Sequence, residues 1–244
     1  MAPQDIKNIL DSIVESAQYD DQELLIETLD SINDDCWKDI DSAIAILDTF
    51  LTNVRSDFFV YPIKFIPDYL FGNENFINRY VNLLCWFYND ELLDYNFTEL
   101  IPSEVLKNKE LCKKFLSCNY CEVVDDVPEE FWGDQSVVFA SLEGLENHIE
   151  YRKNTPMLIT PDKTECISYL FKKVSKDLSN NKDFILDFLD YEYFFDCFDV
   201  VYDWVDKSLW FYKDFVIKVL EKDRDAVNYV TKELLEDEEI KKFC

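Results

Sequence analysis

The chain has 244 residues, of which 48% are hydrophobic and 16% aromatic, so a folded core is expected despite the high charge. Its 51 acidic and 24 basic side chains give a formal net charge of −27, which disfavours direct binding to nucleic acid or an anionic membrane. With 3 glycines and 7 prolines, little turn chemistry remains for β-hairpins, and the composition favours an all-α fold.

Residues 1–60 predict an acidic N-terminal helical region. Apolar periodicity predicts helices over 3–18, after Asp20-Asp21 and after Asp39, with Ala43 and Ile44 facing inward in the third. This region holds 14 acidic and 3 basic side chains, so either it is a solvated acidic face or it binds a basic partner. The partner-binding candidates here are Asp20, Asp21, Glu23, Glu27, Asp30, Asp34 and Asp35.

Residues 61–244 predict a helical-repeat region that packs continuously on the first. The repeated pattern is an apolar residue, an apolar pair four and five positions later, and a corner that leads to Asn or Asp and a longer amphipathic helix. Prolines such as Pro67 and Pro128 fit the first turn of the short helix. The copies of this pattern start at Ile32, Ile66, Ile101, Val127, Val174, Val205 and Val230. The copy at Ile32 is weaker than the others.

One such unit cannot bury its apolar stripe alone, so neighbouring units must stack on one another. The predicted architecture is an irregular, solenoid-like array of short helix–long helix repeats. Phe215–Leu220, Ala226–Val230 and Glu233–Asp237 follow one another in the order of a short helical repeat. This pattern resembles the DUF4116 family of bacterial and viral helical repeats, a resemblance that implies the fold but no established activity.

Two central segments interrupt the predicted helical pattern, and an acidic cluster lies between them. Residues 58–70 predict a short extended piece, and Tyr151–Pro161 predicts an irregular loop with room for a strand at Met157–Ile159. A second acidic cluster, at a repeat start, adds the partner-binding candidates Glu122, Asp125, Asp126, Glu129 and Glu130.

Residues 188–215 are the most aromatic part of the chain. Core filling between stacked repeats is the favoured use of these side chains, and interface anchors are the alternative. The candidates for such anchors are Tyr191, Tyr193, Trp210 and Tyr212.

Catalytic motifs are missing from the sequence. His148 is the single histidine, and no Gly-rich phosphate loop is present, so we expect neither an enzyme nor a cofactor. Cys118 and Cys121 form one CxxC pair, which with His148 leaves a zinc site as a minor alternative. Cys36 and Cys112 occupy apolar positions of the repeat, as buried thiols do in a reducing compartment.

The favoured hypothesis is a non-enzymatic acidic protein that blocks a basic, nucleic-acid-binding surface of a target protein. The composition of the chain resembles that of acidic phage proteins that inhibit host nucleases (anti-CRISPR and anti-restriction proteins) and that of toxin-immunity proteins. The alternative is a helical-repeat scaffold that holds a partner through its aromatic face. The N-terminus shows neither a basic segment nor an apolar one, so a cytoplasmic location is expected.

Overall fold

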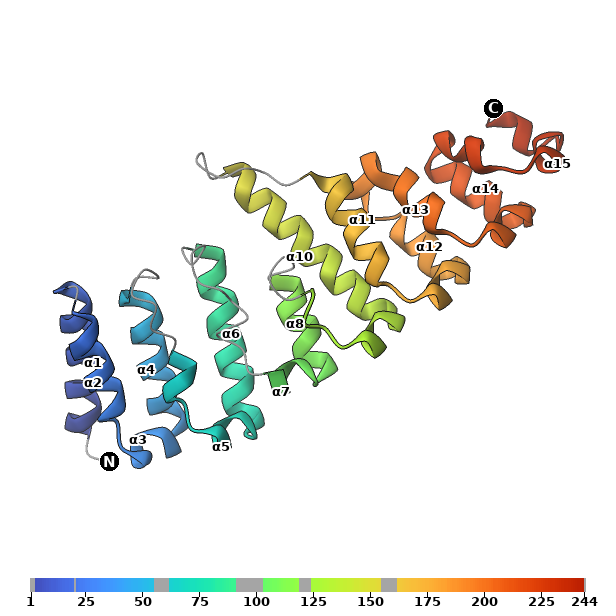
Figure 1. The fold of residues 1–244 in the computed structure, drawn as a ribbon. Helices are drawn as coiled ribbons and strands as arrows, with labels where there is room; N and C mark the ends of the chain where they lie inside the picture. The colour runs from blue at the N-terminus through green and yellow to red at the C-terminus, as the bar shows by residue number, and fades with distance from the viewer. Residues whose placement is uncertain are drawn as a thin grey trace. The chain divides into compact units, whose positions relative to one another are not determined.

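The computed structural model describes residues 3–19, 21–54, 62–90, 103–118, 124–154 and 162–243, and within them all regular secondary structure is helical (Figure 1). The all-α prediction is therefore confirmed. The chain divides into two compact units, 1–127 and 128–244, and the boundary expected near residue 60 falls inside the first. Every helix in the described ranges is too short or too polar to span a bilayer.

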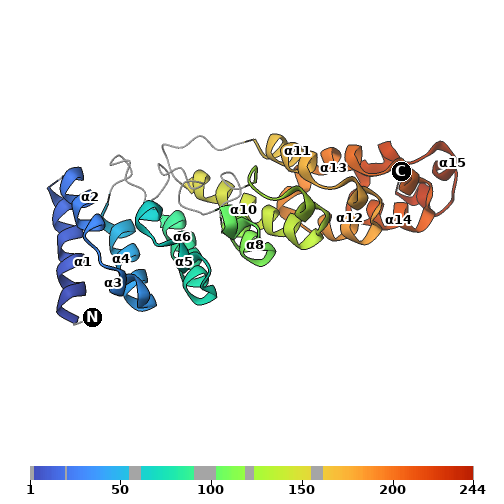
Figure 2. The ribbon, with the colours of Figure 1, turned by 60° about the horizontal axis from the view of Figure 1, so that its bottom comes forward.

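The first unit is a row of helices that pack on their sequence neighbours. Helix α4 contacts α1 and α6, and α6 contacts α8, so helices on both sides of residue 60 belong to one core (Figures 1 and 2). Its elements are α1 (Pro3–Gln18), α2 (Gln22–Asp30), α3 (Asp34–Lys38), α4 (Ile40–Asn53), the 3₁₀ helix η2 (Pro62–Phe65), α5 (Asp68–Phe71), α6 (Glu74–Asp90), α7 (Ser103–Leu106) and α8 (Lys109–Cys118).

The second unit alternates 3₁₀ and α-helices, with α11 packed on α13 and α12 on α14. Its elements are η4 (Glu129–Gly133), α10 (Gln135–Asn154), α11 (Lys163–Lys173), η5 (Lys176–Asn180), α12 (Lys182–Phe188), η6 (Glu192–Cys197), α13 (Phe198–Trp204), η7 (Lys207–Phe211), α14 (Lys213–Lys222), η8 (Arg224–Tyr229), α15 (Lys232–Leu235) and η9 (Ile240–Lys242).

The predicted Asn and Asp corners cap the longer helices. A side-chain oxygen at each corner accepts a hydrogen bond from a backbone N–H two or three residues later, which satisfies a donor that the first turn leaves without an intrahelical partner. These corners, in both units, are Asp39, Asn73, Asn108, Asp134 and Asn181. Asp237 accepts the Glu239 N–H in the same way, but a turn follows it instead of the expected longer helix.

Some local predictions need correction. Pro67 and Pro128 precede α5 and η4 as extended N-cap residues, one position earlier than expected, because their fixed φ also suits extended backbone. The piece expected to be extended over 58–70 is helical in η2 and α5, and α10 continues past Tyr151 to Asn154. In α4, Ala43 is buried as expected, but Ile44, which was expected to face inward, is only half-buried. Ile46 is fully buried in its place. Residues 58–61, Ile101 and Met157–Ile159 lie outside the described residues.

Burial recurs at the same offsets from five of the predicted repeat starts, Ile32, Ile66, Val127, Val174 and Val205, but not from Val230, since Lys241, 11 residues later, is exposed. The starting residue is buried, and so are the positions 11 and 15 residues later, which lie on the inner face of the longer helix. The buried residues at these offsets are Val127, Val138 and Leu142; Val174, Ile185 and Leu189; and Val205, Val216 and Leu220.

A backbone hydrogen bond also recurs in the second unit. The Ser175 N–H donates to the Trp132 carbonyl at 3.0 Å, and 31 residues later the Asp206 N–H donates to the Ser179 carbonyl at 2.9 Å. Each donor directly follows a buried valine, Val174 or Val205, that begins a predicted copy. Each acceptor lies in the 3₁₀ helix of the copy before it, η4 or η5. These bonds fix the register between consecutive segments.

Candidate interaction surfaces

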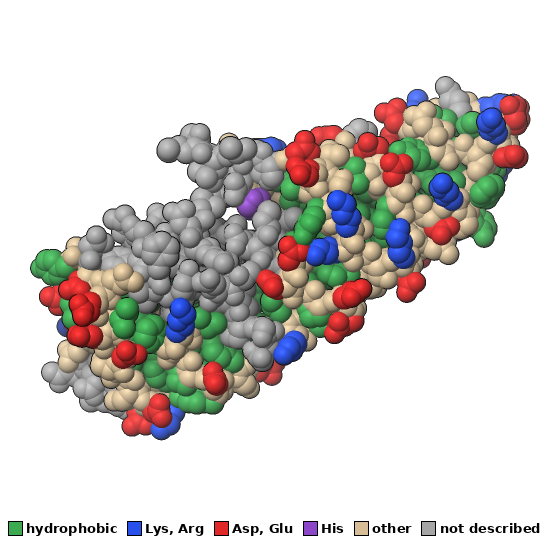
Figure 3. All heavy atoms as spheres, in the orientation of Figure 1, with side chains coloured by type: hydrophobic (Ala, Val, Ile, Leu, Met, Phe, Trp, Pro, Cys, Tyr) green, Lys and Arg blue, Asp and Glu red, His purple; other side chains and the backbone are tan. Residues whose placement is uncertain are grey.

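The N-terminal acidic candidates lie on an exposed face of α2 and α3. Glu23, Glu27 and Asp30 are exposed at positions i, i+4 and i+7 of α2, which places them on one helical stripe. Asp34 and Asp35 continue the exposed acidic run in the first turn of α3. Acidic side chains outnumber basic ones over the N-terminal helices in the space-filling view (Figure 3).

Four of these carboxylates make no ion pair with a cation in the described part of the chain. Asp35 pairs with Lys38 at 3.0 Å, whereas no described lysine or arginine forms an ion pair with Glu23, Glu27, Asp30 or Asp34. Two further candidates differ from this group: Asp21 accepts the Leu24 N–H as the N-cap of α2, and Asp20 lies outside the described residues.

Acids in the second unit are more often paired across helices. Lys213 contacts Asp237 at 2.9 Å and Glu239 at 2.6 Å, and Lys182 lies 3.6 Å from Asp214. The side-chain hydrogen bonds with Glu239 and Asp237 are the main cause that raises the pKa of Lys213, and the bond with Lys213 is the main cause that lowers the pKa of Asp237. Among the described residues, the contrast is that Lys213 and Lys182 form ion pairs across helices, whereas Glu23, Glu27, Asp30 and Asp34 form none.

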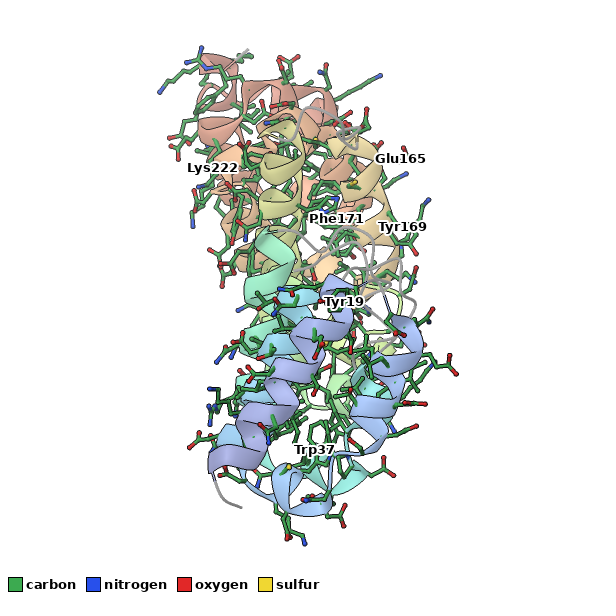
Figure 4. All side chains as sticks on the ribbon, turned by 90° about the vertical axis from the view of Figure 1, so that its left-hand side faces the viewer. Tyr19, Trp37, Glu165, Tyr169, Phe171 and Lys222 are labelled. Atoms are coloured by element: carbon green, nitrogen blue, oxygen red, sulfur yellow. The ribbon has the colours of Figure 1, made fainter. Side chains whose placement is uncertain are left out.

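Exposed apolar side chains accompany this acidic stripe, and the sequence pattern did not identify them. Tyr19, which is labelled in Figure 4, lies at the end of α1. It is 74% exposed, and Leu24 and Ile26 on α2 are each 37% exposed. Tyr69 is half-exposed, and desolvation together with the Asp34 carboxylate raises its pKa. The surface thus combines negative charge with accessible hydrophobic area. We call Glu23, Leu24, Ile26, Glu27, Asp30 and Asp34 the α2–α3 surface.

The second acidic cluster is less uniform. Asp125 and Asp126 are exposed in the first unit, and Glu122 lies outside the described residues. In the second unit, exposed Glu129 and Glu130 line a groove of about 980 Å³ together with Lys172, Lys173 and Lys176. Because lysines share that groove, it does not present a purely acidic surface.

The aromatic candidates are divided between core and surface. Trp210 is buried: its ring stacks on Tyr229 and meets Phe215 edge to face, with centroids 5.6 and 5.7 Å apart. This burial agrees with the core role that the sequence analysis favoured for Trp210. Half-buried Tyr191 stacks on Phe139 with a centroid distance of 5.6 Å.

Tyr193 and Tyr212 remain accessible. The Nζ atoms of Lys153 and Lys163 lie 5.2 and 4.2 Å from the centroid of the half-buried Tyr193 ring. Tyr212 is 51% exposed, with Lys182 Nζ 4.1 Å from its centroid. Its neighbour Phe211, which the sequence analysis did not single out, is 64% exposed.

The structure brings no metal centre together within the described residues. His148 is buried in α10, Cys118 is half-buried at the end of α8, and Cys121 lies outside the described residues. No His, Cys, Asp or Glu side chains in the described ranges form a group suited to hold a metal ion. Cys36 and Cys112 are buried thiols, as expected. Burial raises the pKa of the Cys112 thiol to about 12.

No protein-family model matches the chain, and neither does any curated protein or solved structure.

Proposed function

We propose that the chain is a protein-binding protein whose α2–α3 surface docks on a basic surface of a partner and competes there with nucleic acid. The observation that carries this proposal is the stripe of Glu23, Glu27 and Asp30, which is exposed and makes no ion pair with a described cation. Such a surface attracts cationic partners over distances near the Debye length of about 8 Å at physiological salt, and it raises their association rate.

The charge density of the stripe supports a protein contact rather than a full imitation of duplex DNA. From Glu23 to Asp30 the helix rises about 10 Å, at about 1.5 Å per residue. One DNA strand carries a charge every ~3.4 Å of helix axis, so the stripe is sparser than a phosphate backbone. Leu24 and Ile26 add apolar area that phosphates lack, and this area favours a partner with both basic and hydrophobic side chains.

The same proposal assigns the rest of the chain a scaffold role, as an irregular array of stacked helical repeats. Three features support it: the recurring burial offsets, the Asn and Asp caps, and the recurring bond from Ser175 to Trp132 and from Asp206 to Ser179. A stacked array holds its exposed helix faces in fixed positions, because each unit is braced by its neighbours. The family resemblance of residues 215–237 is consistent with such an array.

A second candidate function is a scaffold that holds its partner through the aromatic segment. The exposure of Phe211 and Tyr212 at the corner between η7 and α14 favours it, since aromatic side chains dominate the energetics of many interfaces. In that case the α2–α3 surface would serve solubility alone.

Affinity capture with two charge-matched variants separates these candidates. The first variant is Glu23→Lys with Glu27→Lys; the control is Asp183→Lys with Asp187→Lys, which reverses two exposed acids at the same i, i+4 spacing on α12. We expect the wild type and the control to capture the same basic, nucleic-acid-binding protein at low salt and to release it at high salt. The first variant should capture about tenfold less.

Equal capture by both variants, or a partner that high salt does not release, would refute the proposed function. If capture instead fails only after Phe211→Ala with Tyr212→Ala, the scaffold candidate replaces it.

A further inference from the structure

A small cleft in the second unit is walled by aromatic rings. It has a volume of about 270 Å³ and lies where α13 and η7 meet η8. Its lining residues are Tyr202, Asp203, Val205, Lys207, Trp210, Phe211, Tyr229 and Thr231. We call it the Tyr229 cleft.

The aromatic wall is rigid. Tyr202 and Trp210 are buried and meet edge to face with centroids 5.6 Å apart, and both rings contact Tyr229 at 5.2 and 5.6 Å. Tyr229 is half-buried in front of this pair, and Phe211 is 64% exposed. A ligand that enters the cleft therefore meets ring surface held in place from behind.

Acidic groups surround these rings. Asp203 lines the cleft and is exposed. Desolvation and the carboxylates of Asp203 and Asp199 raise the pKa of Tyr229, and desolvation and Asp223 raise the pKa of Tyr202. Lys207 is the cation of the lining, and it is exposed. The carboxylates around the rings outnumber it, so the local field favours a positive ligand.

The residues at this corner depart from the pattern of the chain. Asn or Asp occupies the equivalent corners before α4, α6, α8, α10 and α12 and caps the helix that follows, whereas Tyr212 caps α14 without any side-chain hydrogen bond. The position before it carries Lys38, Gly72, Lys107, Gly133, Asn180 or Glu236 in the other copies, none of them apolar and bulky, and exposed Phe211 here. A departure that weakens a helix cap and exposes two rings indicates a role other than folding.

We propose that the Tyr229 cleft binds one cationic side chain of a partner protein, an arginine or a lysine. The ring surface of Tyr229 and Phe211 offers the negative π-face that attracts a cation, and Asp203 supplies the carboxylate that pairs with it. The proposal extends the basic-partner function, but the cleft can be tested without the partner and without the α2–α3 surface.

The test uses the full chain with aromatic side chains labelled for NMR at physiological salt. The probes are N-acetyl-arginine amide and its uncharged isostere N-acetyl-citrulline amide. We expect the arginine probe to shift the Trp210 and Tyr229 resonances saturably, with the citrulline probe at least fivefold weaker. Asp203→Asn and Phe211→Ala should each weaken binding of the arginine probe about three- to tenfold, since both side chains are exposed and neither supports the core.

Two further variants distinguish binding of the arginine probe in the cleft from its general electrostatic attraction to an acidic chain. Asp187→Asn removes an exposed acid from α12, outside the cleft, and should leave the affinity unchanged. Lys207→Gln removes the competing cation and should raise the affinity about twofold or more. The inference is overturned if both probes bind alike, or if Asp187→Asn weakens binding as much as Asp203→Asn. Failure of the α2–α3 charge reversal would leave this result unaffected.

Discussion

The hydroxyl of Tyr202 on α13 donates a hydrogen bond of 2.9 Å to Oδ2 of Asp223, which also caps η8 by accepting the Asp225 N–H at 2.9 Å. Asp223 is 8% exposed, so its carboxylate depends on these donors in place of water. One buried acid thus joins a helix of one segment to the start of the next, beside the proposed cation cleft.

Tyr202→Phe should destabilise the chain measurably. The substitution keeps the ring and removes one donor from a buried carboxylate, which costs about 1.5–3 kcal/mol. Tyr229→Phe is the control. Its hydroxyl is less buried, its bond to the Asp199 carbonyl is longer, at 3.4 Å, and its other partner, the Asp203 carboxylate, is exposed to water, so the loss should be less than ~1 kcal/mol. Urea unfolding of both variants checks this, and equal losses would contradict it.

Truncation of two phenylalanines four positions apart should have very different effects on stability. Phe215 is 1% exposed on the inner face of α14, so Phe215→Ala should cost about 3–5 kcal/mol. Phe211 is 64% exposed, and Phe211→Ala should change stability by less than ~0.5 kcal/mol. Thermal unfolding distinguishes the two. A large loss from Phe211→Ala would show that it supports the fold and would remove one argument for the cleft.

Tyr212→Asp should stabilise the chain or leave its stability unchanged. An Asp at this corner restores a cap worth about 0.5–2 kcal/mol, and it offers Lys182 the kind of ion pair that Lys213 makes with Asp237. The substitution gives up a cation–π contact of about 0.5–1 kcal/mol at an exposed site. The melting temperature should therefore rise or stay level, and Tyr212→Ala, which gains no cap, should lower it. A clear fall for Tyr212→Asp would show that the ring itself supports the fold.

Stability should fall as the pH rises above about 9. In the folded chain burial raises the pKa of Cys112 to about 12, and it also raises the pKa of Tyr80, whereas an unfolded thiol ionises near pH ~8.5. Between these values the unfolded state binds fewer protons, so each pH unit lowers the free energy of unfolding by up to ~1.4 kcal/mol per group. Below pH ~8 this effect is absent.

Urea unfolding at pH 7 to 11 checks this prediction. Cys112→Ala removes one of the groups and should flatten the alkaline slope, even if it lowers stability at pH 7. An unchanged slope in that variant would show that ionisation of Cys112 does not drive the loss.

The sequence predicted the helices well because their signals are local. The capping residues Asp39, Asn73 and Asn181 act on N–H groups two or three positions away, and the burial of Phe76 or Phe215 follows from helical periodicity. Trp210 shows the limit of such signals. Periodicity could not tell a ring that fills the core from one at the surface, because Trp210 is buried by Tyr229, which lies in a later segment.

The candidate surfaces were predictable only in part. The acid content of residues 1–60 indicated a charged surface, but which acids lack cations depends on pairing across helices, as between Arg79 of α6 and Asp41 of α4. The exposure of Leu24, Ile26 and Phe211 depends on what neighbouring segments leave uncovered. The Tyr229 cleft has no signature in the linear sequence, since its walls come from α13, η7 and η8.

The most direct test of the central claim is the dissociation constant of the captured partner as a function of salt concentration, with and without a short DNA duplex. We expect log Kd to rise linearly with log salt, the slope to be smaller for Glu23→Lys with Glu27→Lys, and the duplex to displace the chain. A dissociation constant that does not change with salt, or a complex that binds the duplex without releasing the chain, would contradict the proposal.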